Sequence, residues 1–323
     1  MAILTNTVQT SGIVGAREDL EDVIADLFPD ESYAQTTFDK VDATAVYHEW
    51  LLDILRAPAS NIQVDGDDLG TSGYASYTQP TRAGNYTQIL RATFAIAGTA
   101  DAVNKAGRKR ETARQLVKQM RELKNDFEYA LVRNQGASSG GSATGRSLAS
   151  MESWLATNAV KTTSTASAAT TGFTVGGAPA PSDGTTTVTI TEANLKSAIQ
   201  GAWSAGGNPT TILTSATQKS NLDAFTGVAQ RFVDIGRTEQ ASVIGASNMY
   251  VSSFGSHKIV VHRHVRTSVV LVIDPTMWAI AYLRRPFMQQ MAITGDADKR
   301  MLLLEGTLVC RNEKASAKVV ACS

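Results

Sequence analysis

The stretch from Asp101 to Arg133, DAVNKAGRKRETARQLVKQMRELKNDFEYALVR, contains no proline and only one glycine, Gly107. Its apolar residues recur at spacings of three and four, which predicts one long amphipathic helix. The expected apolar stripe consists of Leu116, Met120, Leu123, Phe127 and Ala130, widened by Val117 and Leu131. Asp101 or Thr99 is expected to cap the start, and Gly136 with the Ser/Gly run behind it to end the helix.

A helix of this length would extend about 45 Å, while a compact globule of this chain length is only about 50 Å across. A helix that nearly spans the molecule, with a narrow apolar stripe, does not suit the middle of a round core. It indicates a spine in a flat or elongated molecule. The alternative is a long helix lying on a larger sheet, as in many enzymes.

The expected helix is basic, although the chain as a whole has 30 Lys and Arg, 30 Asp and Glu, and zero formal net charge. Bulk charge therefore indicates neither a nucleic-acid-binding nor a membrane-binding protein, and any such contact must come from local patches. A net charge near zero offers little repulsion between copies, which is compatible with self-association. The basic residues of the stretch are Lys105, Arg108, Lys109, Arg110, Arg114, Lys118, Arg121, Lys124 and Arg133.

Two cysteines in a chain of 323 residues do not form a disulfide scaffold, and no CxxC motif occurs. We interpret Cys310 and Cys322 as free, mostly buried thiols in a reducing compartment. The N-terminus lacks the layout of a signal peptide, and the longest aliphatic run, Val269–Ile273, is too short to span a bilayer. We expect a soluble protein made in a cytoplasm.

Before the helix, two strand-like runs flank a glycine-rich segment. Thr36–Leu52 is rich in β-branched and aromatic residues, and Tyr86–Gly98 alternates between apolar and polar residues. The simplest interpretation of these runs is two long antiparallel strands joined by an extended tip at Pro58–Asn85. Since an isolated ribbon is marginal in water, the hairpin is expected to project and to be stabilised by another chain. The alternative is an ordinary sheet with a long surface loop.

The remaining chain predicts a polar arm, a low-complexity insertion and a mixed helix–strand region. The arm holds a short helix at 17–28, ended by Pro29, and the insertion is the Thr/Ser/Ala/Gly segment 161–187. Further short helices are expected at 146–156, from Thr191 to near Gly206 and, behind a Ser215/Gln218 capping box, at 216–225. Strands are expected at 209–215, 258–265, 269–273, 278–283, 300–310 and 315–321, with a polar loop at 234–245. The fold class is α+β, with no repeated βαβ period.

No established catalytic or phosphate-binding motif occurs in the sequence. His262 and His264 stand two apart on an expected strand and so share a face, but no third ligand has an obvious place. A solvated strand edge explains them better than a metal site. The acidic tip that begins at Asp65 lacks the ligand spacing of a calcium loop. We expect no cofactor and no metal, and nothing indicates an enzyme.

The order of these blocks resembles the major capsid proteins of tailed bacteriophages, whose fold is shared with the floor of herpesvirus capsids. The most similar motifs are DPTMWAIAYLRRP from Asp274, TGDADKR from Thr294, LEGTLVCRNEKA from Leu304, and AGRKRETA from Ala106. The resemblance covers nearly the whole chain. It implies an N-terminal arm, an extended hairpin loop, a peripheral domain with a spine helix, a low-complexity insertion, an axial domain, and C-terminal strands completing the peripheral domain. The corresponding ranges are 1–35, 36–98, 99–156, 157–190, 191–265 and 266–323.

The resemblance also implies a function. Many copies would form pentamers and hexamers that close into an icosahedral shell around double-stranded DNA, assembled in the host cytoplasm without membrane contact. Scaffolding, portal and decoration proteins are the other expected partners. The basic residues Arg108, Lys109 and Arg110 would face the packaged DNA. Some capsids of this fold carry a Lys–Asn isopeptide bond; because no lysine lies between Lys40 and Lys105, we expect no such cross-link here.

Two other hypotheses remain open from the sequence. One is an α+β metal-dependent enzyme with a site near His262 and His264. The other is a different phage structural part, such as a decoration or tail protein. The long helix beside a long hairpin favours the capsid protein.

Overall fold

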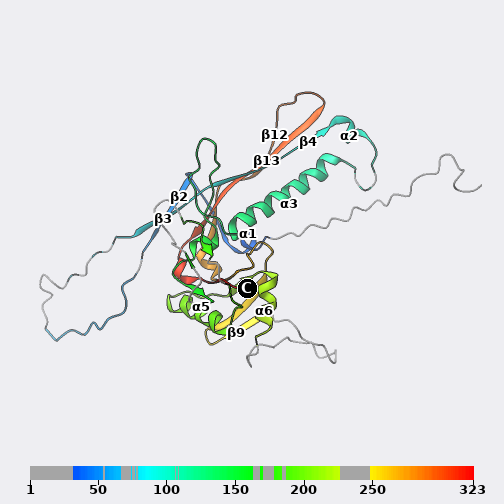
Figure 1. Ribbon diagram of the computed structural model, residues 1–323. Helices are drawn as coiled ribbons and strands as arrows, with labels where there is room; N and C mark the ends of the chain where they lie inside the picture. The colour runs from blue at the N-terminus through cyan, green and yellow to red at the C-terminus, as the bar shows by residue number, and fades with distance from the viewer. Residues whose placement is uncertain are drawn as a thin grey trace, which may run out of the picture.

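The structure is a computed structural model that describes residues 32–53, 55–66, 74, 77, 79–105, 107, 109–162, 168–169, 178–183, 187–225 and 248–323. The arm up to residue 31, most of the 161–187 insertion and the 234–245 loop lie outside these residues. Figure 1 shows an elongated lobe around α3, a two-stranded ribbon with a long loop on the other side, and a compact part with α5 and α6 below. None of the described helices is long and apolar enough to cross a membrane.

A four-stranded sheet forms the elongated lobe. Its order is β1 (Asp39–Asp42), β12 (Trp278–Gln290), β13 (Ala297–Cys310) and β4 (Gln88–Ala97). The long strands β12, β13 and β4 are antiparallel, and β1 runs parallel to β12. The alternation predicted for β4 is confirmed: Leu90, Ala92, Phe94 and Ile96 are at least partly buried, while Ile89, Arg91, Thr93 and Ala95 are exposed.

The helix α3 (Glu111–Val132) covers one face of this sheet, as its amphipathic pattern predicts. Leu123, Phe127, Ala130 and Leu131 are buried and share one core cluster with residues of β13. Val117, however, is 55% exposed, so its expected place in the apolar stripe is wrong. The stripe is narrow at the start of the helix and widens toward its end.

The helix begins ten residues later than the sequence indicates. A separate short helix, α2 (Gly98–Ala102), comes first, and Gly107 lies in the connection with a positive φ of 74°. Asp101 does cap α3, but from outside it: its Oδ1 accepts from the backbone N–H of Glu111 (2.8 Å) and of Thr112 (3.3 Å). Desolvation alone would raise the pKa of Asp101, but these hydrogen bonds outweigh it and hold the pKa below its ordinary value. At 22 residues, α3 is about 33 Å long rather than 45 Å.

The extended hairpin is confirmed only in part. β2 (Tyr47–Leu52) and β3 (Thr81–Tyr86) form a two-stranded antiparallel ribbon of their own. The expected partner of β2, the alternating strand at 86–98, pairs instead with β13 as β4. The prediction placed the residues of β3 in the tip at Pro58–Asn85, whereas they form the second strand of the ribbon, and the chain passes from ribbon to sheet at Thr87. The expected strand 36–52 is divided as well, into β1 of the four-stranded sheet and β2 of the ribbon.

A six-stranded mixed sheet forms the compact part. Its order is β5 (Ala159–Lys161), β14 (Ala317–Val320), β11 (Val269–Ile273), β8 (Thr211–Thr214), β10 (Gly255–Val261) and β9 (Met249–Ser252). Its core cluster includes residues of the helices α5 (Glu192–Ser204) and α6 (Ala216–Asp223). β11 and β14 come from residues 266–323, so this stretch supplies strands to both sheets.

The predicted caps of these two helices are confirmed. The Thr191 side chain accepts from the Asn194 N–H, and the Ser215 side chain accepts from the Gln218 N–H. Gln218 does not return the second bond of a capping box, since its amide donates to Thr267 O (2.7 Å) and Ser323 O (3.1 Å) instead. This helix start is therefore tied to the C-terminal end of the chain.

Short elements complete the described chain. The helix expected at 146–156 is only α4 (Met151–Trp154), and α1 (Tyr33–Thr37) precedes β1. Two 3-10 turns, η2 (Pro275–Met277) and η3 (Glu313–Ala315), and the two-residue strands β6 (Ala168–Ala169) and β7 (Ser182–Asp183) are also present. Gly136 does not end α3; a Cβ there would lie 2.4 Å from the backbone N of Ala180, so glycine is needed for close approach.

Both cysteines are buried and free, as predicted. Burial, helped by the nearby Glu313 charge, raises the pKa of the Cys310 thiol well above its ordinary value. A thiol kept protonated in this way is a poor nucleophile, so Cys310 acts as a packing residue.

Candidate assembly surfaces and the junctions that hold them

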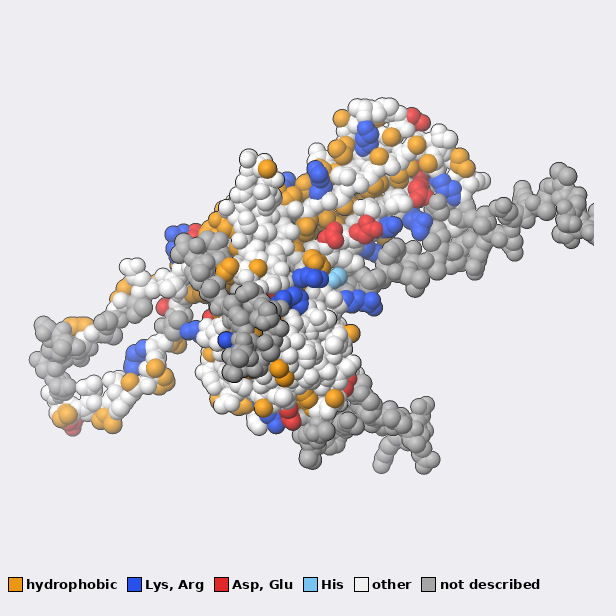
Figure 2. All heavy atoms as spheres, in the orientation of Figure 1, with side chains coloured by type: hydrophobic (Ala, Val, Ile, Leu, Met, Phe, Trp, Pro, Cys, Tyr) orange, Lys and Arg blue, Asp and Glu red, His pale blue; other side chains and the backbone are white. Residues whose placement is uncertain are grey.

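The loop between β2 and β3 exposes a row of large apolar side chains. Leu55 is 93% exposed, Ile62 88% and Tyr77 82%. Val64 and Tyr74 are exposed to a similar extent. Figure 2 shows such side chains along the segment that projects from the body. Single exposed apolar residues are ordinary, but several on one projecting segment indicate a surface that another molecule covers.

The base of this ribbon, in contrast, is fixed firmly to the body. Asn85 is fully buried; its Nδ2 donates to Ala149 O (3.1 Å) and Leu308 O (2.9 Å), and its Oδ1 accepts from the Ala149 N–H (2.8 Å). Trp50 donates from Nε1 to Cys310 O (2.8 Å) and packs against Trp154. These contacts anchor to the body the ribbon that carries the loop.

A buried carboxylate, Glu305, fixes the point where the ribbon joins the sheet. It accepts from the Thr87 hydroxyl (2.9 Å), Arg146 Nη2 (2.7 Å) and Arg284 Nε (2.7 Å). The Thr87 N–H also donates to Val46 O (2.9 Å). Two arginines and a hydroxyl compensate the buried charge, so the pivot between β3 and β4 is held from three directions.

A second buried carboxylate, Glu128 of α3, holds the end of the N-terminal arm. Its Oε1 accepts from the Ala34 N–H (2.6 Å), and its Oε2 accepts from the Gln35 N–H (3.2 Å) and Gln35 Nε2 (3.1 Å). His262, from the loop after β10, places Nε2 3.3 Å from Glu128 Oε1. Glu128 thus joins the arm, the long helix and the compact part at one point.

We expect Glu128→Gln to loosen the arm while leaving the fold intact. An amide offers one acceptor oxygen in place of two, and hydrogen bonds to a charged group, worth about 1.5–3 kcal/mol each, become neutral ones worth about 1 kcal/mol. Hydrogen exchange at the Ala34 and Gln35 amides should accelerate about tenfold or more. Asp126→Asn, an exposed change on the same helix, is the control. Unchanged exchange in Glu128→Gln would contradict the role of this carboxylate.

The predicted solvated strand edge around the histidines is wrong. His262 is fully buried beside Glu128, and both His262 and His264 lie after β10 rather than in it. Among the residues that the structure describes, no group of three or more His, Cys, Asp or Glu side chains is placed to hold a metal ion. His257 is buried too, with Nδ1 2.6 Å from Pro209 O and Nε2 2.7 Å from Ser252 Oγ, and burial lowers its pKa.

The predicted basic residues stand at the start of α3. Lys109 and Arg110 are exposed, and Arg110 is the N-cap residue of the helix; Arg108 lies outside the described residues. Cations are unfavourable at a helix N-terminus because the helix dipole places partial positive charge there. Their position therefore does not serve the stability of the helix.

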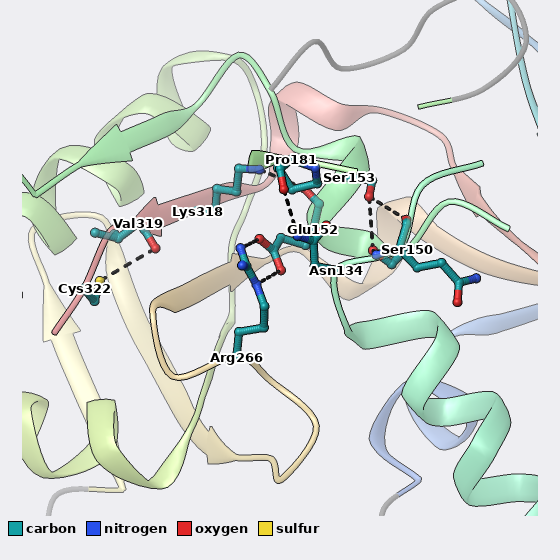
Figure 3. A network of polar contacts seen from close by, with 10 residues as sticks. Asn134, Ser150, Glu152, Ser153, Pro181, Arg266, Lys318, Val319 and Cys322 are labelled. Atoms are coloured by element: carbon teal, nitrogen blue, oxygen red, sulfur yellow. Dashed lines mark hydrogen bonds and ion pairs between the residues drawn. The ribbon is translucent and has the colours of Figure 1, made fainter. Parts of the chain in front are cut away.

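A buried polar network that no local sequence pattern predicts joins α4 to β14 and to the loop before β11 (Figure 3). Arg266 forms a bidentate ion pair with Glu152: Nε donates to Oε2 at 3.0 Å, and Nη2 donates to Oε1. Lys318, fully buried in β14, donates from Nζ to the Glu152 backbone oxygen (2.8 Å). The only sequence signal is a lone lysine within the apolar run 317–322.

The comparisons with known proteins agree with this architecture. A family model described as SU10 major capsid protein matches residues 3–323. The chain belongs to this family. As a major capsid protein it is a structural component of the virion capsid of a bacteriophage, and not a decoration or tail protein.

Solved structures show the same fold at low sequence identity. The chain is similar to a protein of the Cyanophage A-1(L) capsid asymmetric unit, at 13% identity, TM-score 0.65 and 99% coverage of both chains. It is also similar to a chain from the capsid of the native GTA particle (9% identity, TM-score 0.64, covering 99% of this chain and 100% of that one). A third relative comes from the structure of Phage G gp27 major capsid proteins and gp26 decoration proteins (13%, TM-score 0.54, full coverage of both). No curated protein matches the sequence.

Proposed function

We propose that this capsid protein assembles into pentamers and hexamers of an icosahedral shell around double-stranded DNA, built in the host cytoplasm. The bare apolar loop on a rigid base supports this proposal most directly, because such a segment gains stability only when an adjoining copy covers it. The four-stranded part with α3 is the proposed peripheral domain. The compact part with residues 191–265 is the proposed axial domain, which gathers around the symmetry axes.

Negative-stain electron microscopy of the purified chain, with light scattering on the same sample, tests the proposal. Closed shells, tubes or uniform rings of five and six copies are expected, with or without a separate scaffolding protein. A chain that stays monomeric with a scaffolding protein present would overturn the proposal. Portal and decoration proteins are further proposed partners.

We further propose that Arg108, Lys109 and Arg110 face the packaged DNA. Replacing all three by Gln should lower the DNA content of the particles while shells still form, because each lost cation removes a phosphate counter-charge. The ratio of DNA to protein in purified particles measures the effect. A matched control replaces Arg82, Arg285 and Arg311, which are exposed but each paired with a carboxylate. Normal filling of the first variant would refute the role.

A further inference from the structure

The four-stranded sheet has one face that described elements cover only in part: Ala279, Ala281 and Val309 are buried there against Ala43 and Trp50, but the part farther from the ribbon is open. The register pairs Ala92 with Leu302 and Leu90 with Leu304, and these four residues lie on the side of α3. The alternate residues point to the opposite side, because successive side chains in a strand alternate. We call this side the open sheet face, and it consists chiefly of Ile89, Arg91, Phe287, Met291, Lys299 and Met301.

The open sheet face is apolar but carries two cations. Phe287, Met291 and Ile89 are 38%, 43% and 45% exposed. Arg91 and Lys299 line a hollow of about 450 Å³ together with Met291. The nearby carboxylates do not neutralise these cations, since Asp298 pairs with Arg300 and Glu305 is buried beneath its own donors. An apolar sheet face normally packs against another layer. Here the covering layer needs apolar side chains to contact the sheet and carboxylates to pair with Arg91 and Lys299.

One segment of the chain has this composition. Residues 1–31 hold seven of the 30 acidic residues and one of the 30 basic residues, so they carry a charge of −6 and the rest of the chain +6. Within them, the segment 17–28 repeats apolar residues at helical spacing: Leu20, Val23, Ile24, Leu27 and Phe28. Glu18, Asp22 and Asp26 recur every four residues on another side of the same pattern.

We infer that the acidic amphipathic segment 17–28 of one copy packs on the open sheet face of a second copy. Its apolar stripe would bury Phe287, Met291 and Ile89, while its carboxylates meet Arg91 and Lys299. This inference rests on the proposed self-assembly. It also gives the arm a defined destination and explains why a chain of zero net charge divides into an acidic arm and a basic body.

The covering segment comes from another copy because the chain's own arm is too short to reach. The arm enters the body at α1, which packs on α3, the opposite side of the sheet. Residues 29–32 connect the segment to α1, and four residues span at most about 14 Å. With layers about 10 Å apart, a helix on the open sheet face lies about 20 Å from α3.

The loop between β2 and β3 is the competing occupant. Residues 53–80 hold four aspartates and one basic residue, Arg56. Its apolar residues Ile62 and Val64 are two apart, which gives no helical stripe to cover a broad sheet face. Cross-linking of R91C chains with D22C chains or with D65C chains separates the two segments.

Single-cysteine variants test the contact in assembled particles, because the native thiols are buried. Particles assembled from a mixture of D22C and R91C chains are expected, on oxidation or with a short bismaleimide, to give a covalent dimer. The yield should exceed at least tenfold that of D22C with R121C, an exposed position on α3. Equal yields, no dimer from intact particles, or a dimer of R91C with D65C instead would overturn the inference.

Charge reversal provides the second arm. R91E/K299E should lower the assembled fraction at least tenfold, and adding E18K/D22K/D26K should restore it to within threefold of the wild type. As a control, E18K/D22K/D26K is combined with R121E/K124E, which reverses the charge of two exposed residues on α3. This combination should not reach the assembled fraction of the wild type. Wild-type assembly by R91E/K299E would refute the contact, whereas failure of the unaltered chain to assemble would refute the proposed function instead.

Discussion

Replacing residues 53–80 by Asn-Gly is expected to abolish assembly and to leave the monomer folded. The register pairs Leu52 with Thr81, so a two-residue turn closes the ribbon without changing any pair of β2 and β3. Asn-Gly is the preferred sequence for such a turn. The variant lacks the bare apolar loop but keeps the rigid base around Asn85 and Trp50.

The effect on assembly can be separated from the effect on folding, because shortening the loop should not destabilise the monomer. Shortening the flexible loop from residues 53–80 to two residues changes the free energy of closure by roughly 2 kcal/mol, and in the favourable direction. Assembly, by contrast, should fall at least a hundredfold, since each copy loses its contact with a neighbour. Thermal unfolding and circular dichroism report on the fold, and light scattering reports on assembly. A loop replaced by a Gly/Ser segment of equal length is the control; it should also fail to assemble, because it keeps the length but removes the apolar side chains.

Shells of normal yield from the shortened variant would show that the loop is dispensable. A misfolded variant would instead show that the loop belongs to the monomer's own core. The exposures of Leu55 and Ile62 argue against the second outcome.

Features carried by local patterns could be predicted from the sequence. The burial of Leu123 and Phe127 follows from helical periodicity, and the cap at Thr191 follows from the side-chain chemistry of a helix start. β11 was predicted with its observed bounds, because a run of five aliphatic residues suits a strand buried on both faces.

Features decided by distant contacts could not be predicted in this way. The start of α3 depends on Asp101, which lies ten residues from the amide it caps, with Gly107 turning the chain between them. The pairing of β4 with β13 joins segments about 200 residues apart. From local sequence pattern, the charged side chains of Glu128, Glu152 and Lys318 would be expected in solvent. They are buried only because of the tertiary structure.

Glu152→Ala is expected to cause the largest loss of stability from a single substitution outside the apolar core. Glu152 is 2% exposed and forms a bidentate ion pair with Arg266. Removing one partner leaves a largely buried guanidinium uncompensated, which costs about 3–5 kcal/mol. Lys318 keeps its bond to the backbone oxygen of residue 152, so the loss reports on the ion pair and not on the lysine.

Denaturant unfolding of the unassembled chain measures this loss. The exposed pair Lys118–Glu122, 3.7 Å apart on α3, provides the matched control, and Glu122→Ala should cost no more than about 0.5 kcal/mol. In the double variant Glu152→Ala/Arg266→Ala, no charge is left uncompensated, so the total loss should be smaller than the sum of the single losses. Strict additivity would show that the two side chains act independently. The expected coupling would instead show that this pair, between α4 and the loop that links β10 to β11, helps to fix the compact part against the sheet that carries α3.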